Sequence, residues 1–128
     1  QCATQRNLSE EGRAQAVKIG NRFHERGINN AQVYSSQWCR CMETAKLLGL
    51  GPVEELAALN SFFQRYERRE SQNRMLSEWI ARHNLDRPIV LVTHQVNITA
   101  LTGIYPASGE LVIVHRSSTD RPFYSFPG

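Results

Sequence analysis

Strand and helix patterns that alternate along the chain indicate an α/β fold, a three-layer sandwich in which helices flank a mostly parallel central sheet. A second observation agrees with this. Residues 89–92 are an unbroken apolar run, of the kind found in strands that are buried on both faces of a parallel sheet. The chain has 128 residues, 41% of them hydrophobic, which fits one globular domain. We therefore expect residues 1–128 to form a single domain.

Helical spacing of apolar residues predicts four helices, at residues 8–27, 38–48, 71–83 and 96–103. The first helix has the clearest ends, because Ser9 is a good N-cap and Gly27 a good terminator. Its apolar stripe, which includes Ala16 and Phe23, is expected to face the core. Gly49 ends the second helix in the same way as Gly27 ends the first.

Short β-prone runs predict four strands, at residues 32–35, 53–56, 89–92 and 111–114. The second follows the turn signal Gly51-Pro52 and is expected at an edge of the sheet. Residues 60–70 show no periodicity, so we expect a long surface loop there. The tail from residue 116 is polar, contains two prolines, and is expected to be irregular.

Charge and hydropathy narrow the class of protein. The net charge is +3, and thirteen of the fifteen basic residues are arginines; the two lysines are Lys18 and Lys46. The planar guanidinium of arginine binds phosphate and carboxylate oxygens in pairs. No apolar run approaches the ~20 residues that span a bilayer, so no membrane span is expected. Nucleic acid is not an expected partner, because Glu67 and Glu70 interrupt the arginines of residues 65–74 and no recognition motif is present.

Polar residues follow two of the predicted strands. Ser36 comes directly after the first strand and leads to Arg40 in the next helix, and His94 and Gln95 follow residues 89–92. Ligands of open α/β sheets bind at the carboxyl ends of the strands, and helix starts there offer free N–H groups to anions. Arg40 and His94 would form an anion site if the two strands are neighbours, which the sequence leaves open.

Three blocks of the chain carry a resemblance, and they read LSEEGRAQA at residues 8–16, SSQWCRCMETA at residues 35–45 and VTHQ at residues 92–95. They resemble, in the same order, the early helix start, the second-arginine motif and the second catalytic histidine of the histidine phosphatase superfamily, whose fold is called phosphoglycerate mutase-like. The blocks are spread over most of the chain. Each is moderately specific, and their order makes the set strong.

The resemblance implies a phosphatase-type hydrolase that acts on phosphomonoesters or phosphoramidates through a phosphohistidine, with no metal or other cofactor. Arg40 and His94 would be catalytic, and Ser36, Gln95 and Asn7 would bind substrate. A small phosphorylated molecule or a phosphohistidine would be the partner, and the protein would be a small bacterial member of the family. Phosphoryl transfer needs positioning and charge neutralisation above all, which suits such a set of residues.

The chain departs from the family pattern in two places. The family's nucleophile lies in an Arg-His-Gly or Arg-His-Ala motif on an earlier strand, so we expect that strand and its histidine upstream of Gln1. The family's general acid, a glutamate in the loop matching residues 59–62 or an aspartate where Gln95 stands, is also missing. Glu67 and Glu70 are expected to pair with nearby arginines instead. A weak acid favours good leaving groups or phosphoramidates.

A catalytically inactive phosphate-binding or interaction module is the alternative to an enzyme, and the sequence upstream of Gln1 decides between them.

The cysteines give an indication of the cellular compartment. By the family's geometry Cys2 can pair with Cys39 or with Cys41, and a disulfide suits an oxidising periplasm, which we favour over the cytoplasm. Three reduced thiols in a cytosolic enzyme are the alternative, and the localisation stays open.

Overall fold

A computed structural model describes residues 2–62, 65–83, 88–107, 111–114 and 123–126 of the chain. Its main sheet has three parallel strands, and these are β1 (Gln32–Ser35), β2 (Val53–Glu55) and β3 (Ile89–Val92). Their order is β2-β1-β3, so β1 is central and β2 lies at an edge, as predicted. A separate antiparallel pair is formed by β4 (Leu111–Val114) and β5 (Phe123–Phe126).

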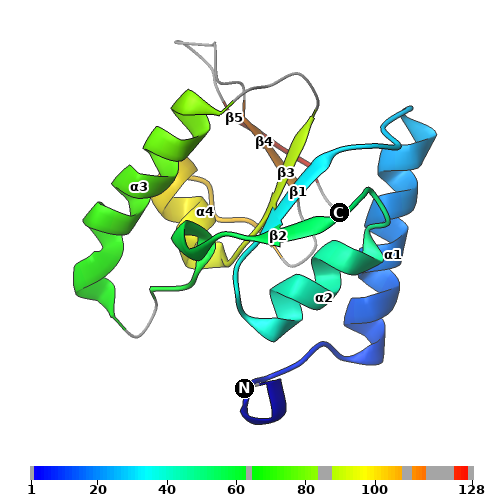
Figure 1. The fold of residues 1–128 in the computed structure, drawn as a ribbon, viewed down its shortest axis with the longest axis horizontal. Helices are drawn as coiled ribbons and strands as arrows, with labels where there is room; N and C mark the ends of the chain where they lie inside the picture. Colours follow the sequence, from blue (N-terminus) through cyan, green and yellow to red (C-terminus); the bar gives the residue numbers. More distant parts are fainter. Residues whose placement is uncertain (1, 63–64, 84–87, 108–110, 115–122, 127–128) are drawn as a thin grey trace.

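Helices cover both faces of the main sheet (Figure 1). On one face lie α1 (Glu10–Glu25) and α2 (Cys39–Leu47), and on the other lie α3 (Arg69–Arg82) and α4 (Gln95–Thr102). Short 3-10 turns occur at Cys2–Thr4, Ala57–Leu59 and Tyr66–Arg68. The predicted three-layer α/β sandwich is therefore confirmed, and its sheet is phosphoglycerate mutase-like in being parallel and flanked by helices.

The alternation of side chains along the strands divides the core into two parts. Val33 of β1 packs with Ile19 of α1 and Ala45 of α2 on one face of the sheet. Tyr34, the next residue of β1, packs on the other face against a cluster that contains Leu76 of α3 and Leu101 of α4. Successive residues of a strand point to opposite faces, and both faces of this sheet find an apolar partner.

α1 and α2 pack closely because α1 carries a glycine at their contact. A Cβ built on Gly20 would lie 2.1 Å from the carbonyl oxygen of Leu48, so no larger residue fits there without moving the backbone. Ser9 caps α1 by accepting a hydrogen bond from the N–H of Gly12, as predicted. Arg13 and Glu43 add an ion pair of 2.6 Å between the two helices.

Three expectations need correction. Residues 60–70 are not loop throughout, because a 3-10 turn and then α3 begin within them, at Tyr66 and Arg69. The tail is not wholly irregular, because Phe123–Phe126 pairs with β4; residues 115–122 and 127–128 lie outside the described part. β3 is not buried on both faces: all four of its residues are half-buried, since β1 is its only partner within the described chain.

Candidate active site

β1 and β3 end side by side, which brings the residues that follow them together. In their parallel register Ser35 is paired with Val92, and the N–H of Ser36 donates to the carbonyl of Val92 at 2.9 Å. The next residues of each chain segment therefore leave the sheet at the same edge. The sequence alone did not show whether these two strands are neighbours. The structure shows that they are, and it places Ser36, Arg40 and His94 in one cluster.

His94 lies at the start of α4 with both ring nitrogens in contact with other side chains. Nε2 is 2.8 Å from Oγ of Ser36, and Nδ1 is 3.4 Å from Nη2 of Arg40. Only 8% of the residue is exposed. Burial, and then the positive charge of Arg40, lower the pKa of His94 to about 4. His94 is therefore neutral at neutral pH.

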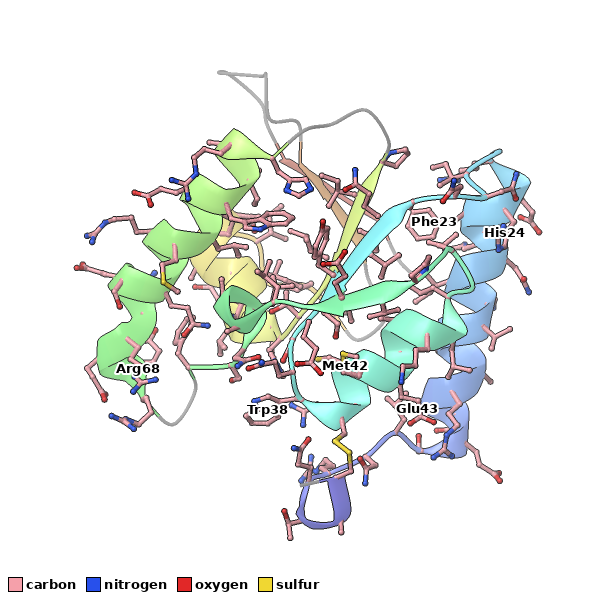
Figure 2. All side chains as sticks on the ribbon, viewed as in Figure 1. Phe23, His24, Trp38, Met42, Glu43 and Arg68 are labelled. Carbon is pink, nitrogen blue, oxygen red and sulfur yellow. A yellow bond between two sulfur atoms is a disulfide. The ribbon has the colours of Figure 1, made fainter. Side chains whose placement is uncertain are left out.

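Arg40 is held beside His94 by an aromatic ring. Its Cζ lies 4.8 Å from the centre of the Trp38 ring, and the same ring makes an edge contact with His94 at 4.9 Å (Trp38 is labelled in Figure 2). A guanidinium over an aromatic face gains a cation–π attraction and loses freedom to move. Trp38 therefore orients both of the predicted catalytic side chains.

A pocket of about 270 Å³ adjoins this cluster. It is lined by residues of α1, α2 and the end of β3, including Gly12, Gln15, Arg40, Thr44 and Thr93. Arg40 contributes the positive charge of the lining, and Gln15 and the two threonines contribute polar groups. The pocket can thus hold a small anion next to Arg40.

Cys41 also touches the histidine, although sequence reasoning did not select it. Its Sγ lies 3.7 Å from Nε2 of His94, and the residue is buried. Burial raises the pKa of this thiol, and the opposing effect of Arg40 is smaller. Cys41 is therefore a neutral thiol that fills space beside the ring.

Asn60 is the second residue that sequence reasoning passed over. Its Oδ1 accepts hydrogen bonds from Oγ of Ser36 at 3.1 Å and from the N–H of Gln37 at 2.7 Å. The only signal for it in the sequence was its place in residues 59–62, the stretch that matches the acid of the family. An amide stands near the site where an acid was sought.

Two of the predicted substrate-binding residues point elsewhere in this structure. Gln95 is exposed and its side chain donates to the carbonyl of Pro106 at 3.2 Å. Asn7 is also exposed and donates to the carbonyl of Cys2 at 2.9 Å. Ser36 has no exposed surface, and it contacts His94 instead of open space. The substrate-binding roles of these three residues stay predictions.

The acidic residues considered as substitutes behave as surface residues. Glu67 pairs with Arg65 at 2.8 Å, as expected, and this hydrogen bond lowers the pKa of Glu67. Glu70 is exposed at the start of α3. In the described part of the chain no three His, Cys, Asp or Glu side chains gather as metal ligands would. Nor is any helix there long and apolar enough to cross a membrane.

A disulfide ties the N-terminal segment to the helix that carries Arg40. It joins Cys2 to Cys39, one of the two pairings considered, and Figure 2 shows it at the start of α2. Beside it, Oε1 of Gln5 accepts a hydrogen bond from the N–H of Cys39 at 2.8 Å. Because Trp38 provides no side-chain cap for α2, Gln5 satisfies one of the free N–H groups at the helix start.

Comparisons with known proteins identify the family of the chain. A family model for the histidine phosphatase superfamily (branch 1) matches residues 1–73, more than half of the 128-residue chain. The chain therefore belongs to the histidine phosphatase superfamily. None of the curated proteins matches it significantly.

Several solved structures share the fold. "Mycobacterial hydrolase 1" is 24% identical with a TM-score of 0.58 over 80% of this chain and 70% of its own. A mycobacterial glucosyl-3-phosphoglycerate phosphatase in complex with VO3 is 22% identical with a TM-score of 0.60, over 80% and 71%. A protein of Thermus thermophilus is 17% identical with a TM-score of 0.66, over 94% and 84%. At these identities the likeness shows the fold alone.

Proposed function

We propose that this chain is part of a phosphatase-type hydrolase that cleaves phosphomonoesters or phosphoramidates through a phosphohistidine. The observation that carries the proposal is the contact between Arg40 and His94, 3.4 Å apart at the carboxyl edge of the sheet. An arginine can bind two phosphoryl oxygens at once, and a histidine beside it can donate to a third when it is protonated. Membership of the histidine phosphatase superfamily supports the same chemistry.

The nucleophile in this proposal is a histidine upstream of Gln1, on a strand that completes the domain formed by residues 1–128. Its imidazole nitrogen attacks phosphorus, a P–N bond forms, and the bond from phosphorus to the leaving oxygen or nitrogen breaks. Water then attacks the phosphohistidine, which releases phosphate and restores the histidine. Arg40 neutralises the charge of the phosphoryl oxygens in both steps, and the site needs no metal for this.

The free edge of β3 supports this location for the missing strand. Within the described residues, β3 pairs only with β1, and its four apolar residues are half-buried. The 270 Å³ pocket lies beside the end of β3 and next to Arg40. A further parallel strand on this edge would end at the same place as β1 and β3 and would bring its last residues to the pocket.

The nature of the leaving group follows from the described residues, among which no carboxylate contacts His94 or Arg40. Asn60 and Gln95 stand where the family's acids were sought, and Glu67 is engaged with Arg65 at the surface. We therefore propose substrates whose leaving group departs without strong acid help, such as phosphoramidates, including phosphohistidine, or esters of acidic alcohols. The Cys2–Cys39 disulfide supports an oxidising compartment such as the periplasm.

Phosphate binding to this chain tests the role of Arg40. We expect inorganic phosphate to bind, and Arg40→Ala to weaken binding by about ten- to a hundredfold, the usual worth of a charge-assisted hydrogen-bond pair. Arg74→Ala is the matched control, because Arg74 is an exposed arginine of α3. Equal affinity in the two variants would contradict the proposed site.

Trapping of a phosphoenzyme tests the reaction. The protein encoded with its upstream segment should hydrolyse phosphoramidate and 4-nitrophenyl phosphate, and acid-labile phosphate should be recovered on a histidine ahead of Gln1. Phosphate binding without turnover in that protein would favour the alternative, an inactive phosphate-binding module.

A further inference from the structure

The amide of Asn60 has a fixed orientation beside His94. Its Oδ1 faces the backbone N–H of Gln37 at 2.7 Å, and its Nδ2 donates to Oε1 of Gln37 at 2.9 Å. A backbone N–H can only donate, so the side-chain atom that faces it is the oxygen. The same oxygen faces Oγ of Ser36 at 3.1 Å. Asn60 is thus an acceptor toward Ser36.

The backbone around Asn60 is held from two helices and the end of a strand. Its carbonyl accepts hydrogen bonds from Nε2 of Gln72 in α3 and, at 2.8 Å, from Nδ2 of Asn97 in α4. The preceding carbonyl, of Leu59, accepts from the hydroxyl of Thr93. Asn97 is buried and Leu59 is fully buried. These contacts keep Asn60 in place beside Ser36.

The hydroxyl of Ser36 has one proton and, besides the weakly hydrogen-bonding thiol of Cys41, three polar neighbours. It accepts from the N–H of Trp38 at 3.2 Å and donates its proton to Oδ1 of Asn60. Toward Nε2 of His94, at 2.8 Å, it therefore presents a lone pair. A hydrogen bond at this contact requires that Nε2 carries the proton of the neutral imidazole.

The other side of the ring favours the same tautomer. Arg40 has only N–H donors, so Nδ1 of His94, 3.4 Å from Nη2, must be the acceptor. In the opposite tautomer a proton on Nδ1 would face the guanidinium, and Ser36 would give up its bond to Asn60. The thiol of Cys41, at 3.7 Å from Nε2, is too weak a partner to reverse this.

We propose that Asn60, acting through Ser36, holds neutral His94 with its proton on Nε2, so that Nδ1 is the atom that takes up a proton when a phosphoryl dianion binds. The second half of this statement rests on the proposed function. In the binding step a proton from solvent joins Nδ1, the ring becomes an imidazolium, and Nδ1–H donates to a phosphoryl oxygen. Asn60 touches neither substrate nor the ring, so it is a positioning residue.

Two groups that carry or can change charge face the ring in the part of the chain that the structure describes. They are the guanidinium of Arg40 and the thiol of Cys41, both from α2. Arg40 disfavours the imidazolium in the free protein, and a bound dianion offsets its charge. Anion binding and protonation of His94 therefore favour each other.

Nitrogen-15 NMR of the histidine side chains tests the tautomer without any activity. In the wild-type chain at neutral pH, Nε2 of His94 should have the shift of a protonated nitrogen and Nδ1 that of an unprotonated one. Asn60→Ala frees the hydroxyl of Ser36 to donate to Nε2, in opposition to the preference that Arg40 sets at Nδ1, so the two shifts should move toward each other. Asn60→Leu has the same expected result and keeps the volume of the side chain.

Two variants that keep an acceptor for Ser36 serve as controls. Asn60→Asp retains an oxygen toward Ser36 and should preserve the proton on Nε2. Gln37→Ala removes the side-chain partner of Asn60 but leaves the backbone N–H of residue 37. This variant should also keep the proton of His94 on Nε2. A wild-type ring with its proton on Nδ1 would overturn the proposal. So would a folded Asn60→Leu protein whose tautomer equals that of the wild type.

Phosphate separates this inference from the proposed function. Saturating inorganic phosphate should raise the pKa of His94 above about 4, so that as the pH is lowered Nδ1 becomes protonated at a higher pH than it does without phosphate. Binding of phosphate with no change at Nδ1 would overturn the second half of the inference and leave the proposed function standing. The expected tautomer with no phosphate binding would overturn the proposed function and leave the role of Asn60 standing.

Discussion

The chemistry of His94 depends on what surrounds it more than on its place in the sequence. The residue is 8% exposed, and its neighbours are a serine, a thiol, an indole and a guanidinium. None of these neighbours carries a negative charge that would stabilise an imidazolium, and the positive charge of Arg40 opposes one. The surroundings therefore favour a neutral histidine, and the proposed phosphoryl ligand would supply the negative charge that an imidazolium needs.

This environment makes the stability of the protein depend on pH. The pKa of His94 is about 4 in the folded chain, whereas an unfolded histidine titrates near 6.5. Between these values the unfolded state binds a proton that the folded state does not. The free energy of unfolding should therefore fall as the pH drops from about 6.5 to about 4, by at most about 1.4 kcal/mol per pH unit from this group. Urea titrations across this range measure it.

His94→Asn is the comparison for that slope, because it removes the titrating ring and keeps a polar side chain. Above about pH 6.5 the contribution of His94 is constant, so the two proteins should differ there by a fixed amount. Below it, the variant should lose less stability than the wild type. Parallel curves down to about pH 4 would show that the ring is not held neutral.

The sequence singled out His94 and Arg40, which the structure brings together, but not the residues that surround them. Each follows a predicted strand, and strand ends of an α/β sheet are where ligands bind. Asn60, Trp38 and Cys41 act through contacts that cross from one segment to another, and no local pattern encodes such contacts. Their roles emerge only when the register of β1 and β3 is known.

Among the helices, α2 is the one whose position governs the site. It carries Arg40 and Cys41, and its start is held by the Cys2–Cys39 disulfide and by Gln5. α1 packs against its other end, where Gly20 meets the backbone at Leu48. The helix is thus held at both ends, and Arg40 lies one residue from the disulfide.

Reduction of the disulfide should weaken both the fold and this attachment. The bond closes a loop with a sequence separation of 37, for which chain entropy predicts a loss of up to about 4 kcal/mol in the free energy of unfolding. Urea unfolding with and without dithiothreitol measures the change. Cys2→Ser should have the stability of the reduced wild type in both conditions and should not respond to the reductant. A wild-type protein equally stable in both conditions would contradict this role.

The elements that the sequence predicted well are those with their own local signals. Ser9, Gly27 and Gly49 mark helix ends in the structure as in the sequence, and the first three strands lie within a residue of their predicted ranges. α3 begins earlier than expected because no capping residue marks its start: Arg68 precedes it without a side-chain cap. β5 was missed because its pairing with β4 is a tertiary contact.

The two edges of the main sheet, β2 and β3, differ in composition. β2 is short and carries exposed acidic residues, as suits an edge strand, whereas β3 is Ile-Val-Leu-Val and, among the segments that the structure describes, pairs only with β1. An apolar strand at an edge exposes unpaired backbone groups and invites pairing with another strand. The apolar sequence of β3 is typical of an inner strand, whereas its place in the described sheet is at an edge. An additional strand on the free edge of β3 would make it an inner strand.

A protein extended upstream of Gln1 should therefore be more stable than residues 1–128. If the added segment forms a strand on β3, it buries the half-exposed residues of Ile89–Val92, so both the free energy of unfolding and its dependence on urea should increase. Amide hydrogen exchange should slow at the N–H groups on the free edge of β3. A matched extension of scrambled sequence is the control, and it should change none of these quantities. If the native and the scrambled extensions behaved alike, the upstream strand would not pair with β3, and the proposed histidine would have no route to the pocket beside Arg40.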